Sequence, residues 1–116
     1  MDAVRRAVAT SEQVNTGVSK SRKWAVTNGV ITVETSFVTD VGIVCTALTI
    51  DVEGSITGNF WFALASHSFT AAELTAQACM FHIVDKPIVW IRTNITTLTQ
   101  TGLGNVSVTV DLLSYD

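Results

Sequence analysis

The sequence predicts an all-β fold, mainly antiparallel, of the β-sandwich or jelly-roll kind, with one short helix and an extended N-terminal arm. Apolar and polar residues alternate with a period of two in several segments, as they do in strands that bury one face. Turn signals built on glycine, asparagine or proline recur about every ten residues between these segments. The segment from 70 to 78 has the composition of a short helix. A chain of 116 residues is long enough for one such domain.

Residues 42–66 are predicted to form two long apolar strands, joined by a turn at Glu53-Gly54-Ser55 and with a second bend at Gly58-Asn59. One face of the first strand carries apolar residues, namely Val44, Leu48, Ile50 and Val52. In the second strand Phe60, Phe62 and Leu64 share one face. Because aromatic side chains bury large apolar areas, we expect this pair of strands to lie at the centre of the core.

The remaining elements follow from local signals. Further strands are expected at 24–27, 30–39, 80–84, 88–96 and 105–115, with loops at 66–68 and 97–104. Asn28-Gly29 is typical of a tight hairpin turn. Thr70-x-x-Glu73 matches a capping box, in which each residue accepts a hydrogen bond from the backbone of the other, so a helix is expected over 71–78.

Residues 1–23 differ from the rest and are expected to form a basic arm on a sandwich body of residues 24–116. The segment has five basic residues against two acidic, a net +3, whereas the rest of the chain has a net −6. We expect a short helical turn at 3–9 and extended or irregular chain after it. Two alternatives stay open: a solvated tail, or an arm that lies across a neighbouring subunit. In the second case the assembly residues are Arg5, Arg6, Lys20, Arg22 and Lys23.

Charge is scarce in the whole chain. Charged residues make up 15% of it, against about 25% in typical domains, and the mean hydropathy is +0.39. We therefore expect part of the surface to be covered by other subunits, in a homo-oligomer or larger assembly.

No apolar run approaches the ~20 residues of a membrane span, and the N-terminus lacks the apolar core of a secretory signal. The few basic residues, without interleaved aromatics, argue against nucleic acid.

No catalytic or metal constellation stands out, so we expect neither an enzyme nor a bound cofactor or metal. Cys79 and His82 are three apart and on a strand would point to opposite faces; a shared metal would also need Cys45 and His67. His67 lies in a Ser-His-Ser loop with no nucleophile elbow and no obvious carboxylate to orient its ring. The cysteines are expected to be buried, reduced thiols.

Three tryptophans are the remaining functional candidates. Trp61, Trp90 and Trp24 alternate away from the presumed core residues. They are expected either to fill a subunit interface, where tryptophan is enriched, or to stack on sugar rings in a carbohydrate-binding module. Carbohydrate therefore remains a candidate partner.

With the arm, the strands and the hydrophobic strand at 106–113 in view, this Thr/Val/Ala-rich chain, poor in Lys and Pro, resembles the small all-β structural proteins of tailed bacteriophages. These include capsid decoration (cement) proteins and small tail proteins. The resemblance implies a non-enzymatic virion component, assembled in the host cytoplasm, that oligomerises and binds other virion proteins of the capsid or tail. Our leading interpretation is a capsid decoration subunit. The alternatives are a tail or adaptor subunit and a carbohydrate-binding module.

Overall fold

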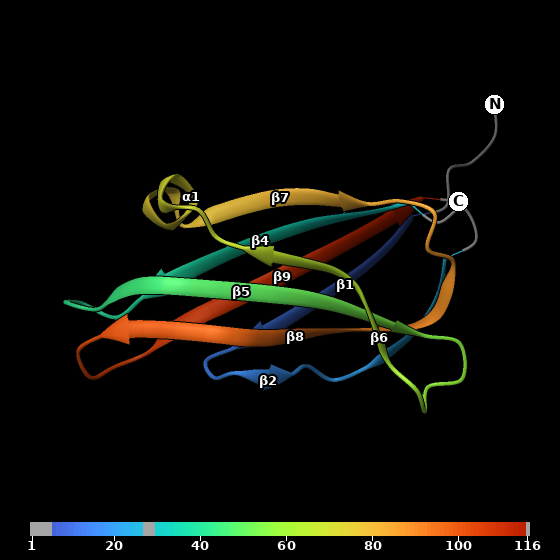
Figure 1. The fold of residues 1–116 in the computed structure, drawn as a ribbon, viewed down its shortest axis with the longest axis horizontal. Helices are drawn as coiled ribbons and strands as arrows, with labels where there is room; N and C mark the ends of the chain where they lie inside the picture. Colours follow the sequence, from blue (N-terminus) through green and yellow to red (C-terminus); the bar gives the residue numbers. More distant parts are fainter. Residues whose placement is uncertain (1–5, 27–29, 116) are drawn as a thin grey trace.

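The computed structural model describes residues 6–26 and 30–115, which form a flattened body with extents of 48 × 35 × 18 Å. Strands dominate this part of the chain, and a single short helix interrupts them (Figure 1). The elements are β1 Arg6–Gln13, β2 Gly17–Val18, β3 Arg22–Val26, β4 Ile31–Thr39, β5 Val44–Ser55, β6 Phe62–Ser68, α1 Ala71–Ala76, β7 Ala78–Ile83, β8 Ile88–Thr101 and β9 Val106–Tyr115.

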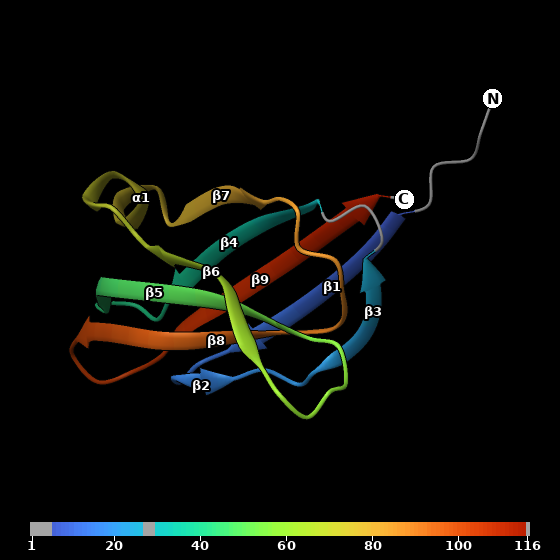
Figure 2. The same cartoon turned by 45° about the vertical axis from the view of Figure 1, so that its right-hand side comes forward.

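The strands form two sheets packed face to face, which confirms the predicted all-β sandwich (Figure 2). Sheet A has the order β1-β9-β4-β7, and sheet B has the order β2-β8-β5-β6, with β3 also paired to β8. Every pairing described is antiparallel. No helix in the described ranges is long and apolar enough to cross a bilayer.

The core lies between the inner faces of the sheets, and β4 and β9 supply it by strict alternation, as predicted. In β4 the alternate side chains Ile31, Val33 and Phe37 are at most 3% exposed. The buried side chains of β9 are Val106, Val108, Val110 and Leu112. Sheet B contributes Leu48, Ile50, Val52, Ile91 and Ile95. Residues with a period of two reach one face of a strand, so a simple pattern in the sequence gives a continuous apolar layer.

In β5 the alternation of buried and exposed side chains shifts by one residue near the start of the strand, which the sequence analysis did not predict. Val44 is exposed and Cys45 buried, although Leu48, Ile50 and Val52 are buried as expected. A bulge against β8 between Cys45 and Ala47 inserts an extra residue and so moves the side chains before it to the opposite face.

The predicted turn at Glu53-Gly54-Ser55 is wrong, because β5 continues to Ser55. Gly54 lies buried inside the strand. A Cβ atom at Gly54 would lie 2.8 Å from Ile88 Cγ2 and 2.9 Å from Leu64 Cδ1. The glycine therefore allows neighbouring side chains to approach the backbone instead of making a turn.

The expectation that Phe60 and Phe62 fill the core is also wrong, since they are 72% and 68% exposed. β6 is an edge strand, and its pairing with β5 shifts register between Val52 and Glu53, so that Leu64 has no partner of its own. Leu64 packs against the core, and the residues before it turn outward. The strand also includes Ser66 to Ser68, which the sequence predicted as a loop.

The capping box of α1 is confirmed. Thr70 Oγ1 accepts from the Glu73 backbone N–H at 3.2 Å, and Glu73 Oε1 accepts from the Thr70 N–H at 2.9 Å. The helix is shorter than predicted because Gln77 adopts a left-handed conformation with φ 62°, which ends the helical hydrogen-bond pattern.

The N-terminal segment contributes strands to both sheets. β1 pairs with β9 from Arg6 opposite Tyr115 to Gln13 opposite Val108, so the helical turn expected at 3–9 is wrong for the described residues of that range. The Ser19 N–H donates to Thr93 O at 2.7 Å, next to the pairing of β2 and β3 with β8. The described part of the predicted arm is thus hydrogen-bonded to the body, and its contact with a neighbouring subunit stays a prediction. The turn at Asn28-Gly29 lies outside the described residues.

Candidate functional site

Among the described residues, the basic side chains of the predicted arm belong to or adjoin the strands that pair with β8 and β9. Lys20, Arg22 and Lys23 are exposed, and the first two line a shallow hollow of about 350 Å³ that also contains Glu12. Arg6 begins β1, and Arg5 lies outside the described residues. Their role in assembly stays a prediction.

The tryptophans lie on or near sheet B. Trp24 is in β3. Trp90 is half-buried in β8 and packs close to Gly58. Trp61, also half-buried, stacks with Arg92, whose Cζ lies 4.2 Å from its ring centroid. Because the guanidinium covers one face of the Trp61 ring, that face is not available to a partner.

A hydrogen-bonded network fixes Arg92 beneath Trp61. The Arg92 Nε donates to Glu53 Oε1 at 2.6 Å, and the Asn94 Nδ2 donates to Glu53 Oε2 at 3.2 Å. The Arg92 and Glu53 side chains are only 23% and 14% exposed. This network joins the last residues of β5 to the first half of β8, beneath the Trp61 ring.

An apolar hollow of about 410 Å³ lies at the end of the sandwich where β5 ends and β6 begins. Ile56, Phe60 and Phe62 line it and are 75%, 72% and 68% exposed. Ser55 Oγ, one of its few polar atoms, already accepts from the Gly58 N–H at 2.8 Å. A surface this apolar suits an apolar protein partner better than a sugar, which needs several polar groups to bind its hydroxyls.

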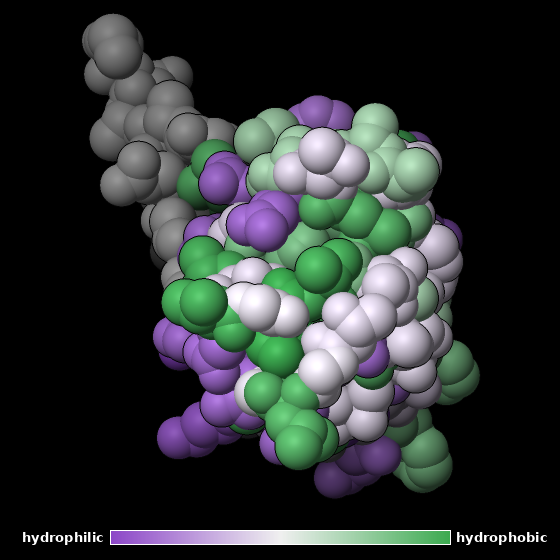
Figure 3. Space-filling view, turned by 90° about the vertical axis from the view of Figure 1, so that its left-hand side faces the viewer, coloured by the Kyte–Doolittle hydropathy of each residue, from purple (hydrophilic) through white to green (hydrophobic). Residues whose placement is uncertain are grey.

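A second apolar surface lies at the opposite end of the long axis, on the β4–β5 and β8–β9 loops. Val41 and Leu103 are fully exposed there, and Val38 and Val44 are 67% and 58% exposed. Figure 3, which faces this end, shows apolar side chains gathered between polar ones. The Asp40 N–H donates to Asn105 O at 3.0 Å and the Asn105 N–H donates to Asp40 Oδ2 at 2.8 Å, so the two loops are tied together.

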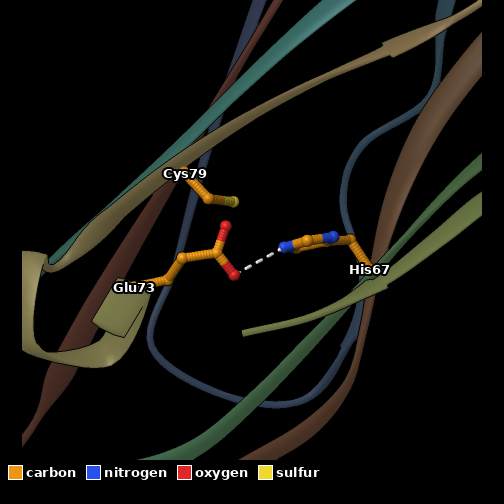
Figure 4. Close-up of side chains that lie close together, drawn as sticks. All are labelled: His67, Glu73 and Cys79. Atoms are coloured by element: carbon orange, nitrogen blue, oxygen red, sulfur yellow. Dashed lines mark hydrogen bonds and ion pairs between the residues drawn. The ribbon is translucent and has the colours of Figure 1, made fainter. Parts of the chain in front are cut away.

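Three side chains that can bind a metal meet beside the helix (Figure 4). They are His67 from β6, Glu73 from α1 and Cys79 from β7, and their ligand atoms all lie within 4.8 Å of one another. His67 Nε2 is 2.9 Å from Glu73 Oε1. The His67 ring stacks on Phe81, with centroids 5.2 Å apart, and meets Phe69 edge-on. β6 and β7 are edge strands of different sheets, so this cluster, which we call the edge cluster, joins the two layers.

Sequence reasoning missed the edge cluster. The expectation that no carboxylate orients His67 is wrong, because Glu73 does so. Cys79 and His82 lie on opposite sides of β7 as expected, with Cys79 buried and His82 exposed and bonded to Thr32 Oγ1. The capping box was the available signal: it holds the Glu73 carboxylate beside the backbone of Thr70, three residues after His67.

The electrostatics of the edge cluster favour a charged carboxylate beside a neutral thiol. The backbone hydrogen bond from Thr70, followed by the bond from His67, lowers the pKa of Glu73. Burial, followed by the Glu73 charge, raises the pKa of Cys79 to about 11, although groups of Thr35 act in the opposite direction. A thiol held protonated is a poor nucleophile. The nitrogen, oxygen and sulfur atoms of the three side chains are of types that can hold a metal ion.

No family model matches the sequence, and no curated protein matches it. Among solved structures, the chain is similar to VP2 of the infectious bursal disease virus subviral particle, with a TM-score of 0.53 and 12% identity. That match covers 98% of this chain, which spans about a third (33%) of the VP2 chain. It shows a shared sandwich fold.

Two further structures align over nearly the whole chain at a lower TM-score of 0.47. One is the capsid of the Helicobacter pylori bacteriophage KHP30, with 13% identity and coverage of 97% of this chain and 92% of that chain. The other is the family 29 carbohydrate-binding module CBM29-2, with 9% identity and coverage of 96% and 92%.

Proposed function

We propose that this protein is a non-enzymatic structural subunit of a virion, and that it acts as a capsid decoration or cement protein. Copies of the chain associate through apolar surface and bind the capsid lattice. The observation that carries the proposal is the exposed apolar surface at both ends of a sandwich with few charges. The same fold in VP2 of a subviral particle supports it.

The apolar hollow is the strongest candidate for a subunit contact. Full burial of a phenylalanine side chain stabilises by about 1.5–3 kcal/mol. Phe60 and Phe62 are roughly two-thirds exposed, so covering both contributes about 3 kcal/mol before the entropic cost of association. Aromatic residues in such hollows are the usual anchors of protein interfaces.

The mass in solution tests the association. We expect the full chain to form oligomers, measured by light scattering and sedimentation equilibrium over a range of concentrations. The double variant Phe60→Ser/Phe62→Ser should shift toward single chains. Met80→Ser is the matched control, since Met80 is 58% exposed and outside the lining of the hollow. A wild-type chain that stays single and clear at high concentration contradicts the proposal.

The virion role needs a separate test. Genes for capsid and portal proteins beside the gene for this chain would support it. The direct experiment adds purified chain to capsids from the same source and measures co-sedimentation, with the Phe60→Ser/Phe62→Ser variant in parallel. Capsids that sediment without the wild-type chain contradict decoration.

A further inference from the structure

We propose that His67, Glu73 and Cys79 form a binding site for a zinc-type divalent cation that links the edges of the two sheets. The three residues come from β6, α1 and β7 and meet where the sandwich is open between its edge strands. This inference is independent of the assembly role, because all three ligands belong to one chain.

The donor atoms select the class of metal. An imidazole nitrogen, a carboxylate oxygen and a thiolate sulfur are the three ligand types that zinc uses in proteins. Calcium and magnesium take oxygen ligands and have no use for sulfur. One thiolate and one carboxylate also supply two negative charges, which balance a divalent cation in a partly buried site.

A zinc ion would fit after small shifts of the three ligand atoms. Tetrahedral zinc with bonds of about 2.0–2.3 Å places its ligand atoms roughly 3.5 Å apart. The atoms of the edge cluster lie within 4.8 Å of one another, and the His67–Glu73 contact at 2.9 Å would open slightly to admit the ion. Rotations of partly exposed side chains cover such distances.

The surroundings hold each ligand in place. Glu73 Oε1 is fixed by the Thr70 N–H, and Figure 4 shows the second carboxylate oxygen on the side of Cys79. Phe81 and Phe69 orient the His67 ring. Thr35 lies opposite Cys79 in the sheet register, and its backbone and hydroxyl groups act on the Cys79 thiol, so the hydroxyl can donate to the thiolate as supporting groups do around metal ligands.

The site is accessible and leaves a coordination position open. His67 and Glu73 are 27% and 25% exposed, which gives an ion a route in. Three protein ligands leave the fourth tetrahedral position to water or to a group from a partner. Bound metal would tie β6 to β7, so its main expected effect is on stability.

The test uses tag-free, full-length protein treated with a chelator and then dialysed. Zn²⁺ alone is titrated by calorimetry and by thermal unfolding, and Co²⁺ is used as a spectroscopic probe. We expect one ion per chain, a thiolate-to-cobalt charge-transfer band, and a rise in Tm of about 10 °C at a hundredfold excess over Kd. Absence of Zn²⁺ uptake overturns the proposal.

The chain supplies matched controls, because it contains two histidines and two cysteines. His67→Gln and Cys79→Ser should abolish the cobalt band, whereas His82→Gln and Cys45→Ser should keep it. Glu73→Gln preserves the capping box and should weaken metal binding at least tenfold. If Cys79→Ser does not fold, the Glu73→Gln and His67→Gln variants test the site on their own. Binding that survives the His67 and Glu73 substitutions, or that is lost in His82→Gln, overturns the proposal.

Discussion

Replacing Arg92 by methionine isolates the contribution of the network beneath Trp61. The substitution keeps most of the side-chain length but removes the charge. Glu53 would then lose the donor at 2.6 Å and keep only the Asn94 amide at 3.2 Å. The stacking of the guanidinium on Trp61 would be lost as well.

The size of the effect follows from burial. Exposed ion pairs contribute 0–1 kcal/mol, whereas removing one partner of a fully buried pair costs about 3–5 kcal/mol. With Glu53 14% and Arg92 23% exposed, the pair lies between these limits, and the cation–π contact adds about 0.5–1 kcal/mol. We expect the free energy of unfolding to fall by about 2–3 kcal/mol, which lowers the Tm by roughly 10 °C.

Urea unfolding at neutral pH, followed by tryptophan fluorescence and circular dichroism, measures this change. Lys86→Met is the control, since Lys86 is an exposed cation between β7 and β8, and it should change stability by less than about 0.5 kcal/mol. A double-mutant cycle with Glu53→Gln separates the ion pair from the stacking. If Arg92→Met lowers the free energy of unfolding by less than about 0.5 kcal/mol, the network does not stabilise the fold and the argument from burial is wrong.

Three further predictions concern local features. Thr70→Ala should destabilise the chain by about 1 kcal/mol while Thr70→Ser does not, because only the first removes the cap oxygen; equal unfolding curves for the two would refute this. Gly54→Ala should cost about 1–3 kcal/mol in urea unfolding, since its Cβ would meet Ile88 and Leu64, and a neutral result would mean that the two side chains yield freely. Because the pKa of Cys79 is raised to about 11, its thiol in metal-free native protein should react with a thiol reagent at pH 8 about a hundredfold more slowly than after unfolding. Mass spectrometry locates the labelled cysteine, and rapid labelling of Cys79 in the native protein would contradict the burial of the thiol.

The sequence predicted the elements whose signals are local. Alternation alone located β4 and β9 and their buried faces, and the Thr70–Glu73 spacing located the start of α1. It failed where pairing with a neighbour decides the outcome. The bulges next to Cys45 and Leu64 arise from register with β8 and β5, and they moved Val44 and Phe62 to the surface.

Non-local pairing also hid two features of the structure from the sequence analysis. The N-terminal segment has a polar composition that resembles a tail, yet β1 pairs with a strand about a hundred residues later in the sequence. The edge cluster takes one residue from each of three elements, and the separation of His67 from Cys79 by a helix and a turn matches no linear metal motif. Only the fold brings these side chains together.

The place of β9 between β1 and β4 governs when the protein can fold during synthesis. Until residues 106–115 leave the ribosome, β1 and β4 have no common neighbour and half of the sandwich lacks its middle strand. The nascent chain must therefore wait with the apolar side of sheet B uncovered, a condition that exposes it to chaperones and to aggregation.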